Sequence, residues 1–188
     1  MISYSIRKKS EVILTADNKF MDMLVNYASA HQHKINVLFH LIGIPTIMLG
    51  IYIPLSWISY EVMGITLSAA HLVTIGLFFF YFTLDAVFSL VFLIMGLIIA
   101  EYALILSTLP MAGTIAAAAF FGGYALQFIG HAIEKSMPVL VKHPIQANLA
   151  APFFVIVEIF GLLKLRKSLF DEINLLVTHH QKIENQVN

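Results

Sequence analysis

The stretch Tyr27-Ala28-Ser29-Ala30-His31-Gln32-His33-Lys34-Ile35-Asn36-Val37-Leu38-Phe39-His40-Leu41-Ile42-Gly43-Ile44-Pro45 decides how this chain is organised. It places three imidazoles, an amide and a cation where a polar N-terminus becomes an almost continuously apolar sequence. Polar groups at a membrane boundary are costly to desolvate unless each has a partner. We therefore interpret this stretch as one half of a site.

A second polar cluster lies much later in the apolar region, in the segment Gln127-Phe128-Ile129-Gly130-His131-Ala132-Ile133-Glu134-Lys135-Ser136-Met137-Pro138. Gln127, His131 and Glu134 follow one another at i, i+4 and i+7, which forms one polar stripe on a helix. Gly130, beside His131, allows another backbone or a ligand to approach closely. This segment is the predicted other half of the site.

The composition identifies an integral membrane protein. Of 188 residues, 59% are hydrophobic and 12% are charged, with a mean hydropathy of +0.85, whereas soluble domains carry about 25% charged residues. Eleven basic and eleven acidic residues cancel, so nothing indicates a nucleic-acid partner. The chain has no cysteine, so a metal must be held by histidine and carboxylate.

The hydropathy pattern predicts an all-α polytopic bundle with about four transmembrane helices. A polar arm (1–19) precedes a single membrane-embedded catalytic domain (20–170), which opens with an amphipathic surface helix, and a polar tail (171–188) follows. A last apolar stretch, interrupted by Pro152 and Glu158, is short enough to re-enter or to lie half-buried. No cleaved signal peptide is expected. The four predicted spans cover residues 37–58, 62–84, 86–106 and 111–129.

The basic residues predict an orientation. Five of the eleven precede the first span, two lie in the connection 131–148, and four lie from Lys164 onward. All three regions favour the cytoplasmic side, which requires four crossings and a last apolar stretch that does not cross. The two polar clusters then meet at one face of the membrane.

His31, His40 and His131 are candidate metal ligands. Asn36 and His40 share a helix face, but His31 lies nine residues before His40, so the chain must break between them if both bind one ion. Imidazoles with one carboxylate suit Fe(II), Zn or another divalent ion, and open positions admit water, O2 or substrate. The residues alone leave open whether these histidines bind metal or pack.

The remaining histidines are expected to have structural roles. His71 is predicted to be a hydrogen-bonded packing residue and His143 a solvated loop residue. The pair His179 and His180 diverges by about 100° on a helix, which disfavours joint chelation.

Three carboxylates of the apolar region are also given structural roles. Asp85 and Glu101 are expected at span ends or in interhelical hydrogen bonds. Glu158 sits at membrane depth, where it must be neutral or paired, for example with Lys135 or a ligand histidine.

The spacing of these residues resembles a known family. The pattern joins His31, Asn36, His40 and Gly43-Ile44-Pro45 to Gln127-Phe128-Ile129-Gly130-His131, Glu134-Lys135 and Pro138, then to Ala151-Pro152-Phe153 and Glu158. It is similar to the small membrane proteins, once a domain of unknown function, whose fungal member is a 2-hydroxy fatty acid dioxygenase. The resemblance runs from about Phe20 to Leu169. In fungal members the segment before the Glu-Lys pair is one residue longer, so His131 matches more closely than Glu134.

The resemblance implies an Fe(II)-dependent α-oxidation, in which a 2-hydroxy fatty acid and O2 give CO2 and a fatty acid one carbon shorter. Substrate, O2 and the lipid bilayer are then the partners, and Lys34 or Lys135 is expected to hold the substrate carboxylate. The short loops favour a bacterial inner membrane, whereas a eukaryotic member would belong to the endoplasmic reticulum. The implied catalytic residues and metal ligands are His31, His40 and His131, with Glu134 as a further ligand; the implied substrate or supporting residues are His33, Asn36, Gln127, Lys135 and Glu158.

Two other functions fit the residues. A membrane di-iron hydroxylase or desaturase usually has about eight histidines in close boxes, and here only His31, His33 and His40 approach a box. A transporter or assembly protein would hold no stoichiometric metal and consume no oxygen. Counting iron per chain separates the three functions.

Overall fold

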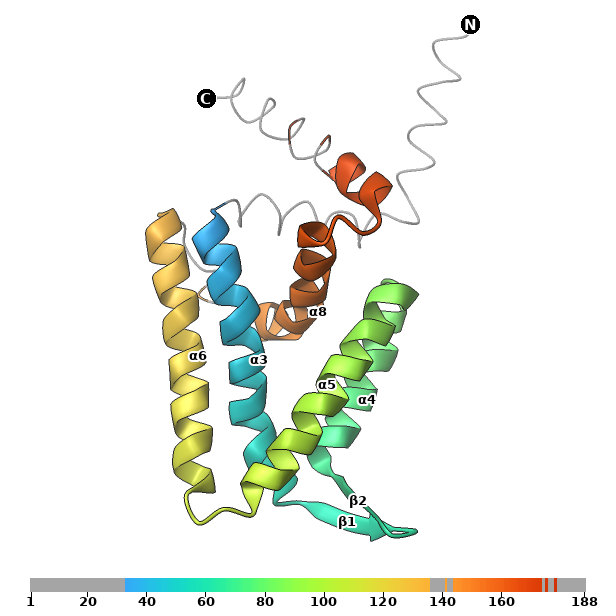
Figure 1. The fold of residues 1–188 in the computed structure, drawn as a ribbon, viewed down its shortest axis with the longest axis vertical. Helices are drawn as coiled ribbons and strands as arrows, with labels where there is room; N and C mark the ends of the chain where they lie inside the picture. The colour runs from blue at the N-terminus through green and yellow to red at the C-terminus, as the bar shows by residue number, and fades with distance from the viewer. Residues whose placement is uncertain (1–32, 136–140, 142–143, 174, 176–177, 179–188) are drawn as a thin grey trace, which may run out of the picture.

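The computed structural model describes residues 33–135, 141, 144–173, 175 and 178. It is mostly helical, as predicted (Figure 1). The predicted polar arm and amphipathic surface helix, and most of the predicted tail, lie outside the described residues. The elements in order are α3 (Lys34–Ser56), β1 (Ser59–Val62), β2 (Ile65–Ser68), α4 (Ala69–Phe82), α5 (Ala86–Ser107), α6 (Ala112–Glu134) and α8 (Pro144–Leu162), followed by a short helix at Lys167–Ile173.

The helices form two antiparallel pairs with α8 between them. In Figure 1, α3 and α6 lie side by side, α4 and α5 form the second pair, and the β1–β2 hairpin lies at the bottom. We call the end where α3 begins and α6 ends the upper end, and the end that carries the hairpin the lower end. The predicted meeting of the two polar clusters requires them to share one end, and the described residues of both clusters do lie at the upper end.

Within the part of the chain that the structure describes, three helices, α3, α5 and α6, are each long and apolar enough to cross a bilayer. At 1.5 Å per residue, 22 or 23 residues extend about 33 Å, and a hydrocarbon core is about 30 Å thick. The predicted second span is wrong in its first third, because a β-hairpin precedes the shorter α4 of 14 residues. Met63 and Gly64 both have positive φ angles, 53° and 78°, and this two-residue turn reverses the chain.

A seam of small residues holds α3 against α6. Gly43 faces Gly123, where an added Cβ would lie 2.9 Å from the Gly123 carbonyl oxygen, and Gly50 faces Ala116 at the same distance from its carbonyl oxygen. Asn36 continues the series opposite Gly130. The contacts recur every seven residues on both helices, so small residues allow close backbone approach along the whole pair.

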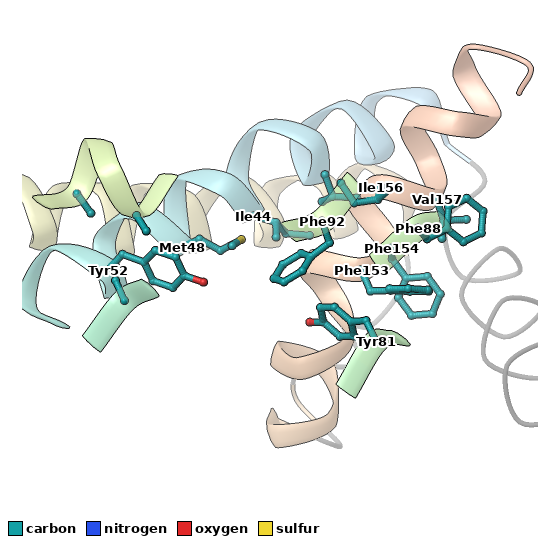
Figure 2. Packing of buried hydrophobic residues seen from close by; sticks show 14 of the residues in the cluster. Ile44, Met48, Tyr52, Tyr81, Phe88, Phe92, Phe153, Phe154, Ile156 and Val157 are labelled. Carbon is teal, nitrogen blue, oxygen red and sulfur yellow. The ribbon is translucent and has the colours of Figure 1, made fainter. Parts of the chain in front are cut away.

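An aromatic core joins α8 to α4 and α5 (Figure 2). The Tyr81 ring lies 4.6 Å from that of Phe92 and 5.1 Å from that of Phe153, between ring centroids. The Tyr81 hydroxyl also donates to the Leu149 carbonyl oxygen at 2.5 Å. These contacts fix α8 within the bundle rather than on its surface.

The last apolar stretch is sharply bent. The segment Ala147–Leu162 and the following helix Lys167–Ile173 meet at a bend of 109°, and Arg166 in the bend bonds Asp85 Oδ2 at 2.6 Å. Asp85 caps the N-terminus of α5, at the upper end (Figure 1). The bend therefore lies at the upper end, and a bent pair of this kind is either a broken span or the predicted re-entrant segment.

Candidate functional site

Two of the predicted metal ligands face each other across the α3–α6 seam. The rings of His40, on α3, and His131, on α6, lie 5.0 Å apart between centroids and almost perpendicular, at 86°. Their exposed fractions are only 6% and 4%. Residues 91 positions apart are thus placed together by the register of two helices, in a site shielded from lipid.

The backbone of α3 sets the tautomer of His40. The Nδ1 atom lies 2.9 Å from the carbonyl oxygen of Asn36, one turn earlier. A carbonyl oxygen only accepts, so Nδ1 must carry the proton and donate it. The Nε2 atom then carries the lone pair, which is the form that a metal ligand requires, with the other ring nitrogen oriented by a backbone carbonyl.

Glu134 is the last residue of α6, and its side chain bonds the first turn of α3. Its Oε1 atom accepts the backbone N–H of His33 at 3.0 Å, and its Oε2 atom accepts the side-chain amide of Asn36. His33 in turn caps α3 by accepting the Ile35 N–H at Nδ1, at 3.3 Å. Both carboxylate oxygens therefore serve to fix the two helix ends together.

Gln127 extends the same polar stripe one turn deeper. It is buried, its Nε2 atom donates to the Phe39 carbonyl oxygen at 3.3 Å, and it occupies the space left by the missing side chain of Gly43. Asn36 is also fully buried, and its Oδ1 atom has no hydrogen-bond partner among the described residues. The predicted polar stripe thus lies inside the helix pair, with an acceptor atom left over.

Comparison with known proteins identifies the family of the chain. Residues 18–163 match the family described as 2-hydroxy-palmitic acid dioxygenase Mpo1-like. The chain belongs to the Mpo1-like family. It is 26% identical over 134 residues to the 2-hydroxy-palmitic acid dioxygenase MPO1 of Saccharomyces cerevisiae, a match that covers 70% of this chain and 74% of the yeast protein. No solved structure is significantly similar.

In this Mpo1-like protein most predicted site residues that the structure describes lie together. His33, Asn36 and His40 from α3 meet the stripe of α6, and Lys135, in a left-handed conformation with φ of 58°, ends that helix beside Glu134. Glu158 is half-buried in α8, and among the described residues no side chain bonds to it. The predicted ligand His31 lies outside the described residues.

The donor set at the upper end fits a metal in part. Nowhere in residues 33–135 and 144–173 do three histidine or carboxylate side chains converge on one point. Two buried imidazoles do meet there, and the tautomer of His40 suits coordination. These two residues would hold the ion, and the further donor that the sequence predicts, His31, lies outside the described residues.

The sequence did not reveal a second polar network, near the lower end. The Ser68 N–H donates to His71 Nδ1 at 3.1 Å, so the His71 Nε2 atom carries the proton and donates to Glu101 at 3.2 Å. This bonding confirms the structural roles predicted for His71 and Glu101. The sequence did not indicate Ser68 as the partner of His71, because the hairpin that places Ser68 at the start of α4 was not predicted.

Proposed function

We propose that this protein is an Fe(II)-dependent 2-hydroxy fatty acid dioxygenase. The balanced reaction converts R–CH(OH)–COOH and O2 into R–COOH, CO2 and H2O, and the substrate supplies all four electrons. The observation that carries the proposal is the buried pair His40 and His131 at the upper end of the membrane helices. Family membership supports the same substrate class.

The side chains around the pair have distinct roles in this proposal. His40 and His131, with His31, would hold Fe(II), which supplies the one-electron chemistry that activates O2. The Asn36 carbonyl oxygen keeps the proton of His40 on Nδ1, away from the metal side of the ring. Glu134 fixes the distance between the two helices through its bonds to His33 and Asn36. We therefore assign Glu134 to positioning, although the sequence pattern grouped it with the ligands.

The substrate would be held at its charged end. Lys34 begins α3 and Lys135 ends α6, both side chains are exposed, and each is the chain neighbour of a residue in the His33–Glu134 bond. A cation there attracts the substrate carboxylate and brings the adjacent 2-hydroxyl carbon to the imidazole pair. In this proposal the acyl tail remains in the apolar environment of the helices and bilayer, and the substrate reaches the site from the membrane.

The charge distribution supports a cytoplasmic site. Among the described residues, the basic side chains are Lys34, Lys135, Lys164, Arg166 and Lys167, and all belong to the upper end. By the positive-inside tendency this end faces the cytoplasm. We propose a bacterial inner membrane as the host, or the endoplasmic reticulum if the source is eukaryotic.

The direct test is oxygen uptake by the purified, detergent-solubilised protein with Fe(II) and a long-chain 2-hydroxy fatty acid. We expect one O2 consumed per product molecule, a fatty acid one carbon shorter by mass spectrometry, and one iron per chain. Chelation should remove the activity and iron should restore it. Two irons per chain would favour a di-iron hydroxylase, and the absence of both iron and oxygen uptake would favour a non-enzymatic membrane protein.

A further inference from the structure

The β1–β2 hairpin has one apolar and one polar face. In its register Tyr60 pairs with Leu67 and Val62 pairs with Ile65, so these four side chains point to the same side. The alternate pairs are polar and point to the other side: Ser59 with Ser68, and Glu61 with Thr66. A two-stranded ribbon with this division is amphipathic.

The apolar face is uncovered by the described part of the chain. All four of its side chains are exposed, Tyr60 at 71%, and the tip residue Met63 is 99% exposed. Trp57, which leads from α3 into the hairpin, is 58% exposed. Glu61, on the polar face, is the only charged residue between positions 57 and 68. A contiguous exposed apolar surface of this kind indicates a binding partner.

We propose that the hairpin lies in the lipid interface of the leaflet opposite the site, with its apolar face against the acyl chains. The hairpin directly continues α3, whose 23 residues are long enough to cross, so the ribbon starts at the far membrane surface. Trp57 and Tyr60 are the residue types that concentrate at headgroup depth. The free strand edges need water, which the interface supplies and the hydrocarbon core does not.

This placement fixes the depth of the bundle. The hairpin anchors the lower end of α3 at one interface, and the length of α3 then places Lys34 and the imidazole pair near the other. The anchor does not depend on the reaction catalysed at the upper end. The hairpin anchor and the proposed function can therefore be tested independently of each other.

The chain carries its own reporter for the test, because Trp57 is its single tryptophan. The full-length protein is reconstituted into phosphatidylcholine vesicles that contain lipids brominated either high or low on the acyl chain. We expect stronger quenching of the Trp57 fluorescence by the shallow bromines than by the deep ones, and little quenching by aqueous iodide added to both faces.

Two neighbouring substitutions provide the matched comparison. Ile65→Lys places a charge on the apolar face and Thr66→Lys places the same charge on the polar face. The first should shift the Trp57 emission to longer wavelength and raise iodide quenching, whereas the second should leave both unchanged. Equal responses of the two variants would contradict the assignment of the faces.

Other occupants of the apolar face give different results. The chain lacks cysteine, so Met63→Cys introduces the only thiol. Disulfide-linked dimers in dilute vesicles, with no quenching of Trp57 by brominated lipid, would show that a second copy covers this face and would overturn the proposal. Strong iodide quenching without lipid quenching would place the hairpin in water and would overturn it equally.

Discussion

The clamp formed by Glu134 can be tested by moving its charge across the helix pair. The carboxylate accepts one hydrogen bond from the His33 N–H and one from the amide of Asn36, which is fully buried. Glu134→Gln preserves an oxygen for His33 but turns an amide N–H2 group toward the amide N–H2 group of Asn36. Two donors then face each other inside the site, and one charge-assisted hydrogen bond is lost.

The loss of stability in Glu134→Gln can be estimated from the one hydrogen bond that is lost. A hydrogen bond to a charged group contributes about 1.5–3 kcal/mol to stability, so Glu134→Gln should lower the free energy of unfolding by about that amount. For a chain of this length the loss lowers Tm by roughly 3–12 °C. In the double variant Asn36→Asp with Glu134→Gln, a carboxylate on α3 accepts from the amide on α6, and most of the loss should be recovered.

Thermal unfolding in detergent, followed by circular dichroism, measures the stability of the four members of this cycle, and metal analysis gives the iron content of each. If Glu134 positions the helices, the double variant regains both Tm and iron. If Glu134 is itself an iron ligand, the double variant regains Tm but not iron, and our assignment is refuted. An unchanged Tm in Glu134→Gln would refute the clamp itself.

Three further outcomes follow from the described contacts. Gly123→Ala should cost about 1–3 kcal/mol of stability, because its Cβ would lie 2.7 Å from a carbonyl oxygen of the facing helix. A Cβ at Gly122 would meet nothing within 4 Å, so Gly122→Ala should be neutral or stabilising by up to about 1 kcal/mol. Equal effects of the two substitutions on the free energy of unfolding would argue against the seam. His131→Ala should abolish iron retention, whereas His71→Ala should lose stability but keep iron, and metal analysis of both checks this. Lys135→Ala should raise KM more than it lowers kcat in the oxygen-uptake assay, and the reverse would remove Lys135 from substrate binding.

The polar stripes were predictable because helix geometry alone dictates them. Gln127, His131 and Glu134 share a face at any register of α6, and costly polar groups in an apolar sequence must meet partners. Their meeting with Asn36 and His40 followed from counting crossings with the basic residues. The structure confirms that both clusters occupy one end, and it does so without the N-terminal segment that carries His31.

The pairing of individual side chains was not predictable in the same way. Asn36 bonds Glu134 because the small-residue seam sets the helix register to within one residue, and a slide of one turn would give different partners. The seam is visible in the sequence only when Gly43 and Gly50 are read against Gly123 and Ala116, which requires knowing that these helices pair. The order of crossings alone does not specify that pairing.

The hairpin was missed for a different physical reason. Residues 62–84 form one continuous apolar run, and hydropathy measures transfer to lipid without distinguishing a helix from an interfacial ribbon. The turn depends on two consecutive positive φ angles, at Met63 and Gly64. Methionine is a poor marker of that conformation, so only the glycine pointed to a turn.

The position of the imidazole pair along its helices suits a substrate whose carboxylate prefers water and whose acyl tail prefers lipid. His40 lies six residues inside the start of α3 and His131 three residues before the end of α6, which at 1.5 Å per residue is about 9 Å and about 4.5 Å from the helix ends. In the proposed function, imidazoles placed deeper would require the substrate carboxylate to be desolvated, and imidazoles placed nearer the helix ends would draw its acyl tail out of the bilayer. Because Glu134 and the Gly130–Asn36 contact close the seam at that level, the register that buries the histidines also keeps them close to the ends of their helices.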